Sequence, residues 1–213
     1  MRLLLAALLP AVALAAPRLA DAVVAVVDQS TLTLSDVDLE TRVTLINAGG
    51  LDAATAPLDG RALAAGLEQV IDEELLAADA DRLHVPAPEP QVLEQALARF
   101  AGKFAGPDAF RAFLRVQDVS EADLQALLSR DLRAQAYLEG RFKLAATARD
   151  ADIDAFLKAH ADAAKGRSPA VAREAARTQL TQERYLKLTR DLLGELRRRA
   201  DVRVIEDLRA ELP

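Results

Sequence analysis

The side chains that carry most enzyme chemistry are scarce in this chain of 213 residues. It has no cysteine, so it has no thiol nucleophile, no thiolate metal ligand and no disulfide. Its two histidines, His84 and His160, lie far apart, each near the expected end of a helix, where an imidazole is usually solvated or contacts terminal carbonyl groups. Two separated histidines without a carboxylate set predict no catalytic centre, no metal site and no bound cofactor.

The acidic, hydroxyl and basic residues also lack a catalytic pattern. Asp72, Glu73 and Glu74 are adjacent, but successive helical residues point in different directions, so we expect a solvated helix face rather than an acid–base pair. No serine has the Gly-x-Ser-x-Gly setting of a hydrolase, and no glycine-rich phosphate loop occurs. The arginines 197–199 fall at a predicted helix C-terminus, where the helix dipole favours them; contact with an anionic lipid or substrate is the alternative.

Four phenylalanines are the candidate peptide-binding residues. Phe100, Phe104, Phe110 and Phe113 flank a Gly-Pro bend. One interpretation is that they fill the core of a helical subdomain. The other is that some of them line an apolar groove that accepts apolar or aromatic side chains of unfolded polypeptides.

The elements that must position these residues are mostly helices, because alanine, leucine, arginine and acidic residues dominate and aromatic residues make up only 4% of the chain. We expect Ser35, Ser120 and Asp150 to cap three of the helices. Apolar residues at helical spacing predict helices over residues 35–47, 59–83, 89–104, 107–116, 121–146, 150–160 and 169–199.

Strand patterns occur only near the two ends. Residues 23–34 alternate β-branched and polar side chains around a turn near Gln29-Ser30, which predicts a β-hairpin. Val202 to Ile205 read as a lone strand, which needs a partner for its backbone groups. We therefore expect it to pair with the hairpin and join the two ends of the chain. The predicted fold class is mostly α, with a small antiparallel sheet formed by the N-terminal hairpin and a C-terminal strand.

The first residues predict export. A single arginine, a short apolar run and the small-x-small pattern Ala13-Leu14-Ala15 are typical of a signal peptide over residues 1–15. The run is shorter than a membrane-spanning helix, although an uncleaved anchor is the alternative. We expect a periplasmic protein without stable membrane insertion. Its formal net charge of −6 argues against a nucleic-acid partner.

Several segments together carry a resemblance to a known family. They are Val24 to Asp28 with Thr33 to Asp38, Gln69 to Leu76, Phe110 to Leu114, Tyr137 to Phe142, and Leu196 to Val204. In this order, behind a leader, the chain resembles the N-terminal chaperone domain of SurA-like and PrsA-like foldases, which are related to trigger factor in their peptide-binding region. The resemblance implies one chaperone domain over residues 16–213: a hairpin and helices over 23–160, a linker over 161–168, and a closing helix and strand over 169–205.

The chain departs from that family in one respect. Larger members carry a parvulin-type prolyl isomerase domain between the helix near 150–160 and the closing helix. The interval here is only the linker 161–168, too short for a domain of 50 or more residues. Parvulin sites also use paired histidines, which this chain does not bring together in sequence. We therefore expect no isomerase activity, and no enzyme activity of another kind.

The resemblance implies an exported, ATP-independent chaperone that binds unfolded or partly folded polypeptides and assists the folding of outer-membrane or secreted proteins. Two alternatives remain open at this point. One is a degenerate prolyl isomerase. The other is a helical structural module that forms a homodimer or binds one folded partner.

Overall fold

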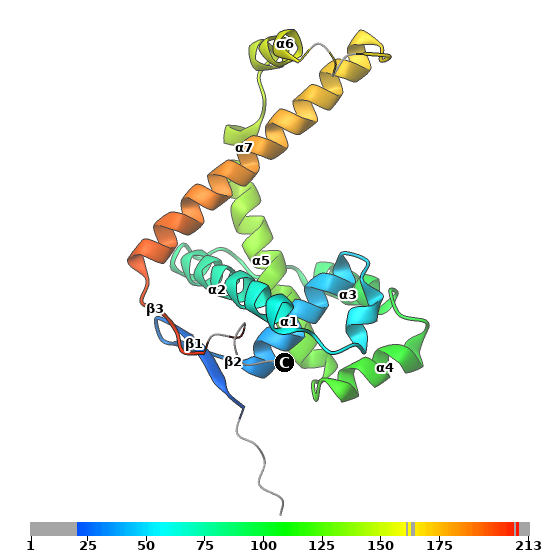
Figure 1. Cartoon of the computed structure of the whole chain (residues 1–213), viewed down its shortest axis with the longest axis vertical. Helices are drawn as coiled ribbons and strands as arrows, with labels where there is room; N and C mark the ends of the chain where they lie inside the picture. The colour runs from blue at the N-terminus through cyan, green and yellow to red at the C-terminus, as the bar shows by residue number, and fades with distance from the viewer. Residues whose placement is uncertain (1–20, 161, 163–164, 207, 209–213) are drawn as a thin grey trace, which may run out of the picture.

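The computed structural model describes residues 21–160, 162, 165–206 and 208; the predicted signal peptide lies outside this part. Its described residues form seven α-helices and one three-stranded antiparallel sheet (Figure 1), which confirms the predicted fold class. The elements are β1 (Val23–Val27), β2 (Ser30–Thr33), α1 (Leu34–Asn47), the 3-10 helix η1 (Leu51–Ala54), α2 (Gly60–Arg82), α3 (Pro90–Ala101), α4 (Pro107–Val116), α5 (Glu121–Ala146), α6 (Asp150–Ala159), α7 (Pro169–Arg199) and β3 (Val202–Val204).

The hairpin turn lies one residue earlier than predicted. Val27 pairs with Ser30, so the turn consists of Asp28 and Gln29 rather than Gln29 and Ser30. Asp28 has a φ of 53°, the left-handed conformation that tight hairpin turns require and that aspartate tolerates better than most residues. Asp28 is therefore the first turn residue, and Ser30, which was expected in the turn, begins β2.

Two helix caps were also predicted at the wrong residue. Helix α1 is capped by Thr33, not Ser35: Thr33 Oγ1 accepts from the Asp36 amide, and the Asp36 carboxylate accepts from the Thr33 amide. Both residues fit a capping pattern, and the end of β2 at Thr33 decides between them. Helix α6 begins after Arg149, whose amide donates to Asp152, so Asp150 is the first helical residue and not the cap. The predicted cap at Ser120 is confirmed.

The sheet joins the two ends of the described chain, as predicted. The strand order is β2-β1-β3, and β3 runs antiparallel to β1 with Ala25 opposite Val204. The amide of Asp28 donates to the carbonyl of Asp201 at 2.9 Å, and the amide of Asp201 donates to the Asp28 carboxylate at 2.8 Å. The Ile205 amide then donates to the Val24 carbonyl at 2.8 Å. β1 is therefore the central strand, paired on both edges.

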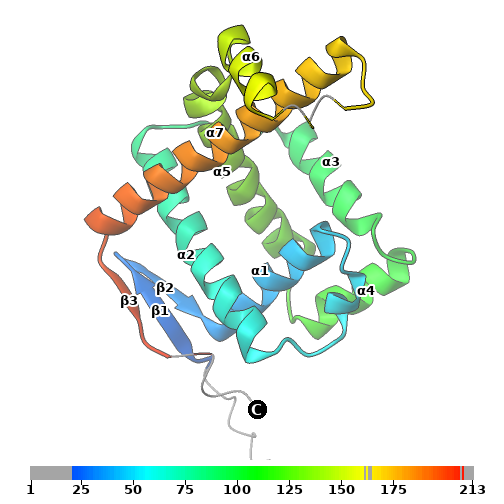
Figure 2. The ribbon, with the colours of Figure 1, turned by 45° about the horizontal axis from the view of Figure 1, so that its top comes forward.

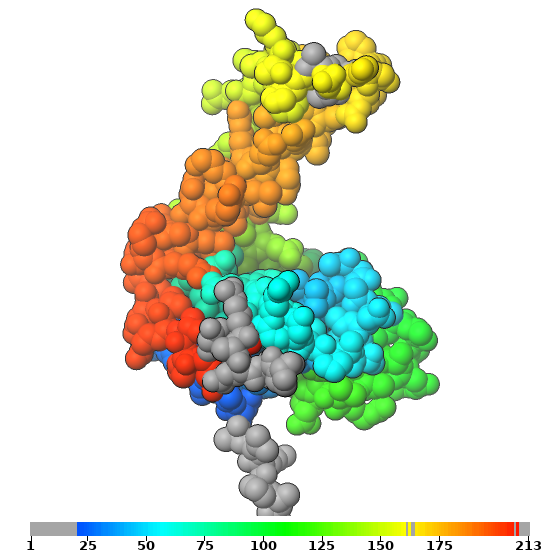
Figure 3. All heavy atoms as spheres, viewed as in Figure 1, coloured from blue at the N-terminus to red at the C-terminus, as the bar shows by residue number. Residues whose placement is uncertain are grey.

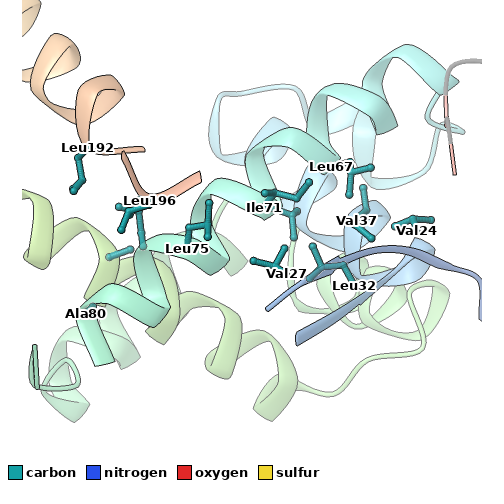
Figure 4. Close-up of a cluster of buried hydrophobic side chains, with 14 of the residues drawn as sticks. Val24, Val27, Leu32, Val37, Leu67, Ile71, Leu75, Ala80, Leu192 and Leu196 are labelled. Atoms are coloured by element: carbon teal, nitrogen blue, oxygen red, sulfur yellow. The ribbon is translucent and has the colours of Figure 1, made fainter. Parts of the chain in front are cut away.

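Two large hydrophobic cores stabilise the described part of the molecule. The first lies between the sheet, α2, the second half of α5 and the end of α7, where Val24, Ile71 and Leu196 are buried (Figure 4). The second lies between α1, α3, α4 and the first half of α5. Helix α5 contributes to both cores, so it fixes one relative to the other.

The helices form a body and a projecting arm. The arm consists of α6, the N-terminal half of α7 and the last turns of α5, and it extends away from α1 to α4 (Figures 1 and 2). At about 1.5 Å per residue, the 31 residues of α7 span about 46 Å, long enough to run from the tip of the arm to the sheet. The arm has its own small core of Ala148, Ile153 and Ala176, with Phe156 and Leu157 packed against it.

Candidate functional site

The space between arm and body is the first candidate site. The space-filling view shows a hollow between the arm and the body, with part of α5 at its floor (Figure 3). Helix α5 contacts α2 and α3 in the body and α7 toward the arm, so it links the two parts. We call this hollow the cradle, defined by α3, the second half of α5 and the arm.

The arm is held in position by ion pairs as well as by its small core. Arg173 and Arg177 on α7 both pair with Asp150 on α6, at 3.2 and 3.1 Å. Arg184 pairs with Asp152 at 2.8 Å. Solvent screens these pairs, so each contributes little alone, but together they fix the direction of α6 along α7.

The second half of α5 presents a stripe of small and aliphatic residues. Leu132, Ala136, Gly140 and Leu144 are spaced four residues apart, and such residues lie along one side of a helix. Ala136 and Gly140 are exposed, and a Cβ built on Gly140 meets no atom within 4 Å. The Leu144 side chain is 91% exposed, more than any other large hydrophobic residue in the described part of the chain. Apart from the half-buried Leu132, this α5 stripe is exposed apolar surface in the described structure.

A cavity adjoins the start of the α5 stripe. It has a volume of about 450 Å³ and lies between α3 and α5. Its wall combines apolar groups with two cations and one carboxylate: Asn47, Ala96, Arg99, Phe100, Lys103, Leu128, Asp131, Leu132 and Gln135. Because Leu132 belongs to both, the cavity and the α5 stripe form one continuous surface.

The structure brings the four predicted phenylalanines together in the second core. Their ring centroids are 5.3–6.4 Å apart in edge-on and tilted pairs, which aromatic side chains favour. Phe100, Phe104, Phe110 and Phe113 are 1%, 9%, 7% and 3% exposed. This arrangement matches the core interpretation of the four rings. Only Phe100 also lines the α3–α5 cavity, so any part in peptide binding falls first to that ring.

The histidines occupy helix ends. His84 follows α2 with a φ of 56°, and its Nδ1 lies 3.2 Å from the Arg82 carbonyl. His160 ends α6, where its ring stacks on Phe156 at 4.4 Å and its Nδ1 lies 3.0 Å from the Phe156 carbonyl. Over the described residues, no group of three or more histidine and acidic side chains is placed to hold a metal ion.

A buried ionic cluster connects α1, α2 and α5, and the sequence pattern did not reveal it. The guanidinium of Arg130 donates to Glu40 Oε1 and lies 3.8 Å from the Glu74 carboxylate, which also accepts from the Ser30 hydroxyl. Burial raises the pKa of Glu40 to about 7 against the opposing effect of Arg130, and burial likewise raises the pKa of Asp131 to about 7. Glu40 Oε2, Arg130 Nε and Asp131 Oδ1 have no hydrogen-bond partner among the described atoms.

The acidic run on α2 was predicted to be solvated, but its members face different partners. Asp72 pairs with Arg197 of α7 at 2.7 Å, and Glu74 joins the buried cluster. Arg197 also pairs with Glu68 at 2.8 Å, so this arginine attaches the end of α7 to α2. In the sequence, the run of three arginines at the end of this helix was the one indication of such a contact, and it favoured a structural role for these arginines.

The described part of the chain contains no helix that is both long and apolar enough to cross a membrane. Comparison of the chain with models of known protein families and with curated protein sequences finds no match.

Proposed function

We propose that the protein is an exported, ATP-independent chaperone that binds non-native polypeptides in the cradle. The observation that supports this most is the α5 stripe, whose Ala136, Gly140 and Leu144 are exposed on the helix that links body and arm, two parts that are each packed around a core of their own. Exposed apolar surface of this kind is a usual sign of a binding site.

The order of elements supports the same proposal. The N-terminal hairpin, the helical body, the arm and the closing helix and strand follow one another as the resemblance to SurA-like and PrsA-like chaperones implies. Export rests on the predicted leader over residues 1–15, and a periplasmic location follows from it.

Binding would proceed by burial of aliphatic groups, without a covalent step. An apolar side chain of the client packs on Leu132, Ala136 or Leu144. The adjacent client residue enters the α3–α5 cavity. There Arg99, Lys103 and Gln135 provide hydrogen-bond donors for client carbonyl groups. Because the stripe is short, the affinity is modest. A client that folds buries its own apolar surface and leaves.

The test is the aggregation of an unfolded outer-membrane-type client in the presence of excess purified protein. Wild type is expected to slow aggregation. Leu144→Ser removes exposed apolar contact area and is expected to weaken client binding by about 1 kcal/mol, about fivefold in Kd. Gly140→Arg places a bulky cation on the stripe and is expected to have a larger effect.

Leu51→Ser is the matched control, because Leu51 is 40% exposed on η1, which does not form the cradle. Equal loss with Leu51→Ser and Leu144→Ser, or no effect of the wild type at severalfold excess, would overturn the proposal. A proline-limited folding assay distinguishes the proposed chaperone from a degenerate prolyl isomerase. Light scattering and a test for selective binding of one folded partner distinguish it from a helical structural module.

A further inference from the structure

A second concave surface lies on the body, between the start of α1, the loop 117–119 and the first half of α5. Two cavities of about 540 and 440 Å³ form it, and they share Asp36, Leu39, Asp118 and Val119. They are therefore one continuous groove, which we call the acidic groove. Each half has the size of an ordinary ligand pocket.

The floor of the acidic groove is apolar. Leu34 and Leu39 of α1, Val119 of the loop, and Ala126 and Leu127 of α5 line it. Leu39 and Val119 are half-buried because they pack against the second core from outside. The floor can therefore hold an aliphatic side chain without any movement of the core.

The rim of the acidic groove is negatively charged. Asp21, Asp36, Asp118 and Asp123 line it, and over the described residues none of them has a lysine or arginine within ion-pair distance. The only cation lining the groove in the described part of the chain is Arg130, which Glu40 and Glu74 already engage.

Three of the rim carboxylates are held in place by neighbouring donors. Ser35 donates to Asp21 through both its amide and its hydroxyl. The amide and hydroxyl of Thr33 donate to Asp36, and those of Ser120 donate to Asp123.

These bonds also keep two of the rim carboxylates ionised. At Asp123 the hydrogen bonds from Ser120 lower the carboxyl pKa, and at Asp21 the bonds from Ser35 and Thr33 together outweigh burial with the same result. Asp21 and Asp123 are therefore both held in position and charged near neutral pH.

An independent observation lies deeper in the acidic groove. Glu40 lines it with only 9% of its side chain exposed, and its Oε2 accepts no hydrogen bond from the described residues. A buried carboxylate oxygen without a donor is costly. An ammonium or guanidinium group entering the groove would supply a donor to Oε2, the oxygen that Arg130 does not reach.

From this combination we infer that the acidic groove binds an extended polypeptide segment in which aliphatic residues alternate with lysine or arginine. The aliphatic side chains pack on Leu39, Val119 and Leu127, and the basic side chains pair with the rim. A bare metal ion would not use the apolar floor, and a nucleic acid or an anionic lipid surface would be repelled by the rim. This site does not depend on the cradle, so the two proposals can fail separately.

The test is direct binding of a short fluorescent peptide that alternates leucine and lysine, followed by anisotropy. A peptide of the same length that alternates leucine and glutamate is its control. The lysine peptide is expected to bind saturably, more tightly at low than at physiological salt. The glutamate peptide is expected not to bind.

The variants Asp118→Asn and Asp118→Asn/Asp123→Asn remove rim charge while keeping the side-chain shape. Asparagine tolerates the left-handed backbone of Asp118, whose φ is 53°. The double variant is expected to bind the lysine peptide about threefold to tenfold more weakly. Asp52→Asn, which makes the same change outside the groove on η1, is expected to leave binding unchanged.

Circular dichroism and the unfolding midpoint verify that each variant is folded. Equal affinity for the two peptides, absence of saturable binding, or equal affinity of wild type and the folded Asp118→Asn/Asp123→Asn protein would each overturn the inference. Gly140→Arg in the cradle is expected to leave lysine-peptide binding intact, which separates this result from the aggregation test.

Discussion

At the scale of single residues, the most consequential feature is the ionic cluster around Arg130. The guanidinium is shared by Glu40 and Glu74, and Glu73 adds a further negative charge near Glu40 and Asp131. Burial of such groups is expensive, and the unpartnered oxygens of Glu40 and Asp131 show that compensation is incomplete. The cluster therefore links the three helices α1, α2 and α5, and it also makes the stability of the fold depend on pH.

We predict that the free energy of unfolding falls as pH rises from about 5 to 8. Burial raises the folded-state pKa of Glu40 and Asp131 to about 7, so in this window the folded state binds more protons than the unfolded state. The contribution of these two groups to the free energy of unfolding is largest below their ordinary pKa values. It decreases as pH rises through their folded-state pKa of about 7. The expected loss is about 1–3 kcal/mol.

Urea unfolding across this pH range measures the effect. Glu40→Gln and Asp131→Asn should each flatten the dependence, while Asp52→Asn should leave it unchanged. Asp79 and Asp123 have lowered pKa values, so their effect on the free energy of unfolding changes only at more acidic pH. They therefore do not mask the trend between pH 5 and 8. A stability that is constant or rises between pH 5 and 8 would contradict this assignment.

Residue-level chemistry was only partly predictable. The ends of α2 and α6 could be located from sequence, and the two histidines do lie there. The ionic cluster could not be found, because Glu40, Glu74 and Arg130 come from three helices whose relative rotation depends on packing. For the phenylalanines, spacing alone could not separate a core from an open groove, since both place the rings on one side of a helix.

At the scale of elements, two helical glycines have opposite roles. Gly66 lies where α1 and α2 pack closely: a Cβ there would be 1.8 Å from Thr41 Oγ1 and 3.0 Å from Thr41 Cβ. Thr41 is buried, and its hydroxyl donates to the Val37 carbonyl at 2.6 Å, so it cannot easily move. Gly140, by contrast, faces open space on the α5 stripe.

We predict that Gly66→Ala destabilises the protein by about 1–3 kcal/mol through overpacking. Gly140→Ala is expected to stabilise it by about 0.5–1 kcal/mol, because alanine favours the helix and meets no neighbour. Chemical denaturation of the two variants beside the wild type measures both changes. A Gly66→Ala variant as stable as the wild type would contradict the close packing of α1 and α2 at Gly66, and a destabilised Gly140→Ala variant would contradict the open surroundings of Gly140.

Apolar spacing predicted the positions of the helices well, but it predicted their ends only where a proline or a capping box marks them. The bounds of α4 and α5 match prediction, since proline or a capping box marks their starts. The start of α1 was misplaced, because Thr33 and Ser35 offer equivalent hydroxyl groups and only the length of β2 selects the first. The helix predicted to reach residue 104 ends at Ala101, where Gly102 follows.

At the scale of the whole molecule, closure of the sheet is the organising feature. Strand β3 returns to β1 after the chain has built the body and the arm, and Arg197 attaches the adjoining end of α7 to α2. This closure was predictable because a lone strand requires a partner. The depth of the cradle was not, because it depends on the angle between α7 and the body, which no local pattern encodes.

The central claim is that unfolded polypeptide lies in the cradle, and site-specific photo-crosslinking tests it most directly. A photoreactive residue is placed at position 140 on the α5 stripe or, as a control, at position 51 on η1, which lines neither the cradle nor the acidic groove. We predict crosslinks from position 140 to an unfolded client, few from position 51, and none from either to the same client once folded. Equal crosslinking from both positions, or equal crosslinking to folded and unfolded client, would contradict the account.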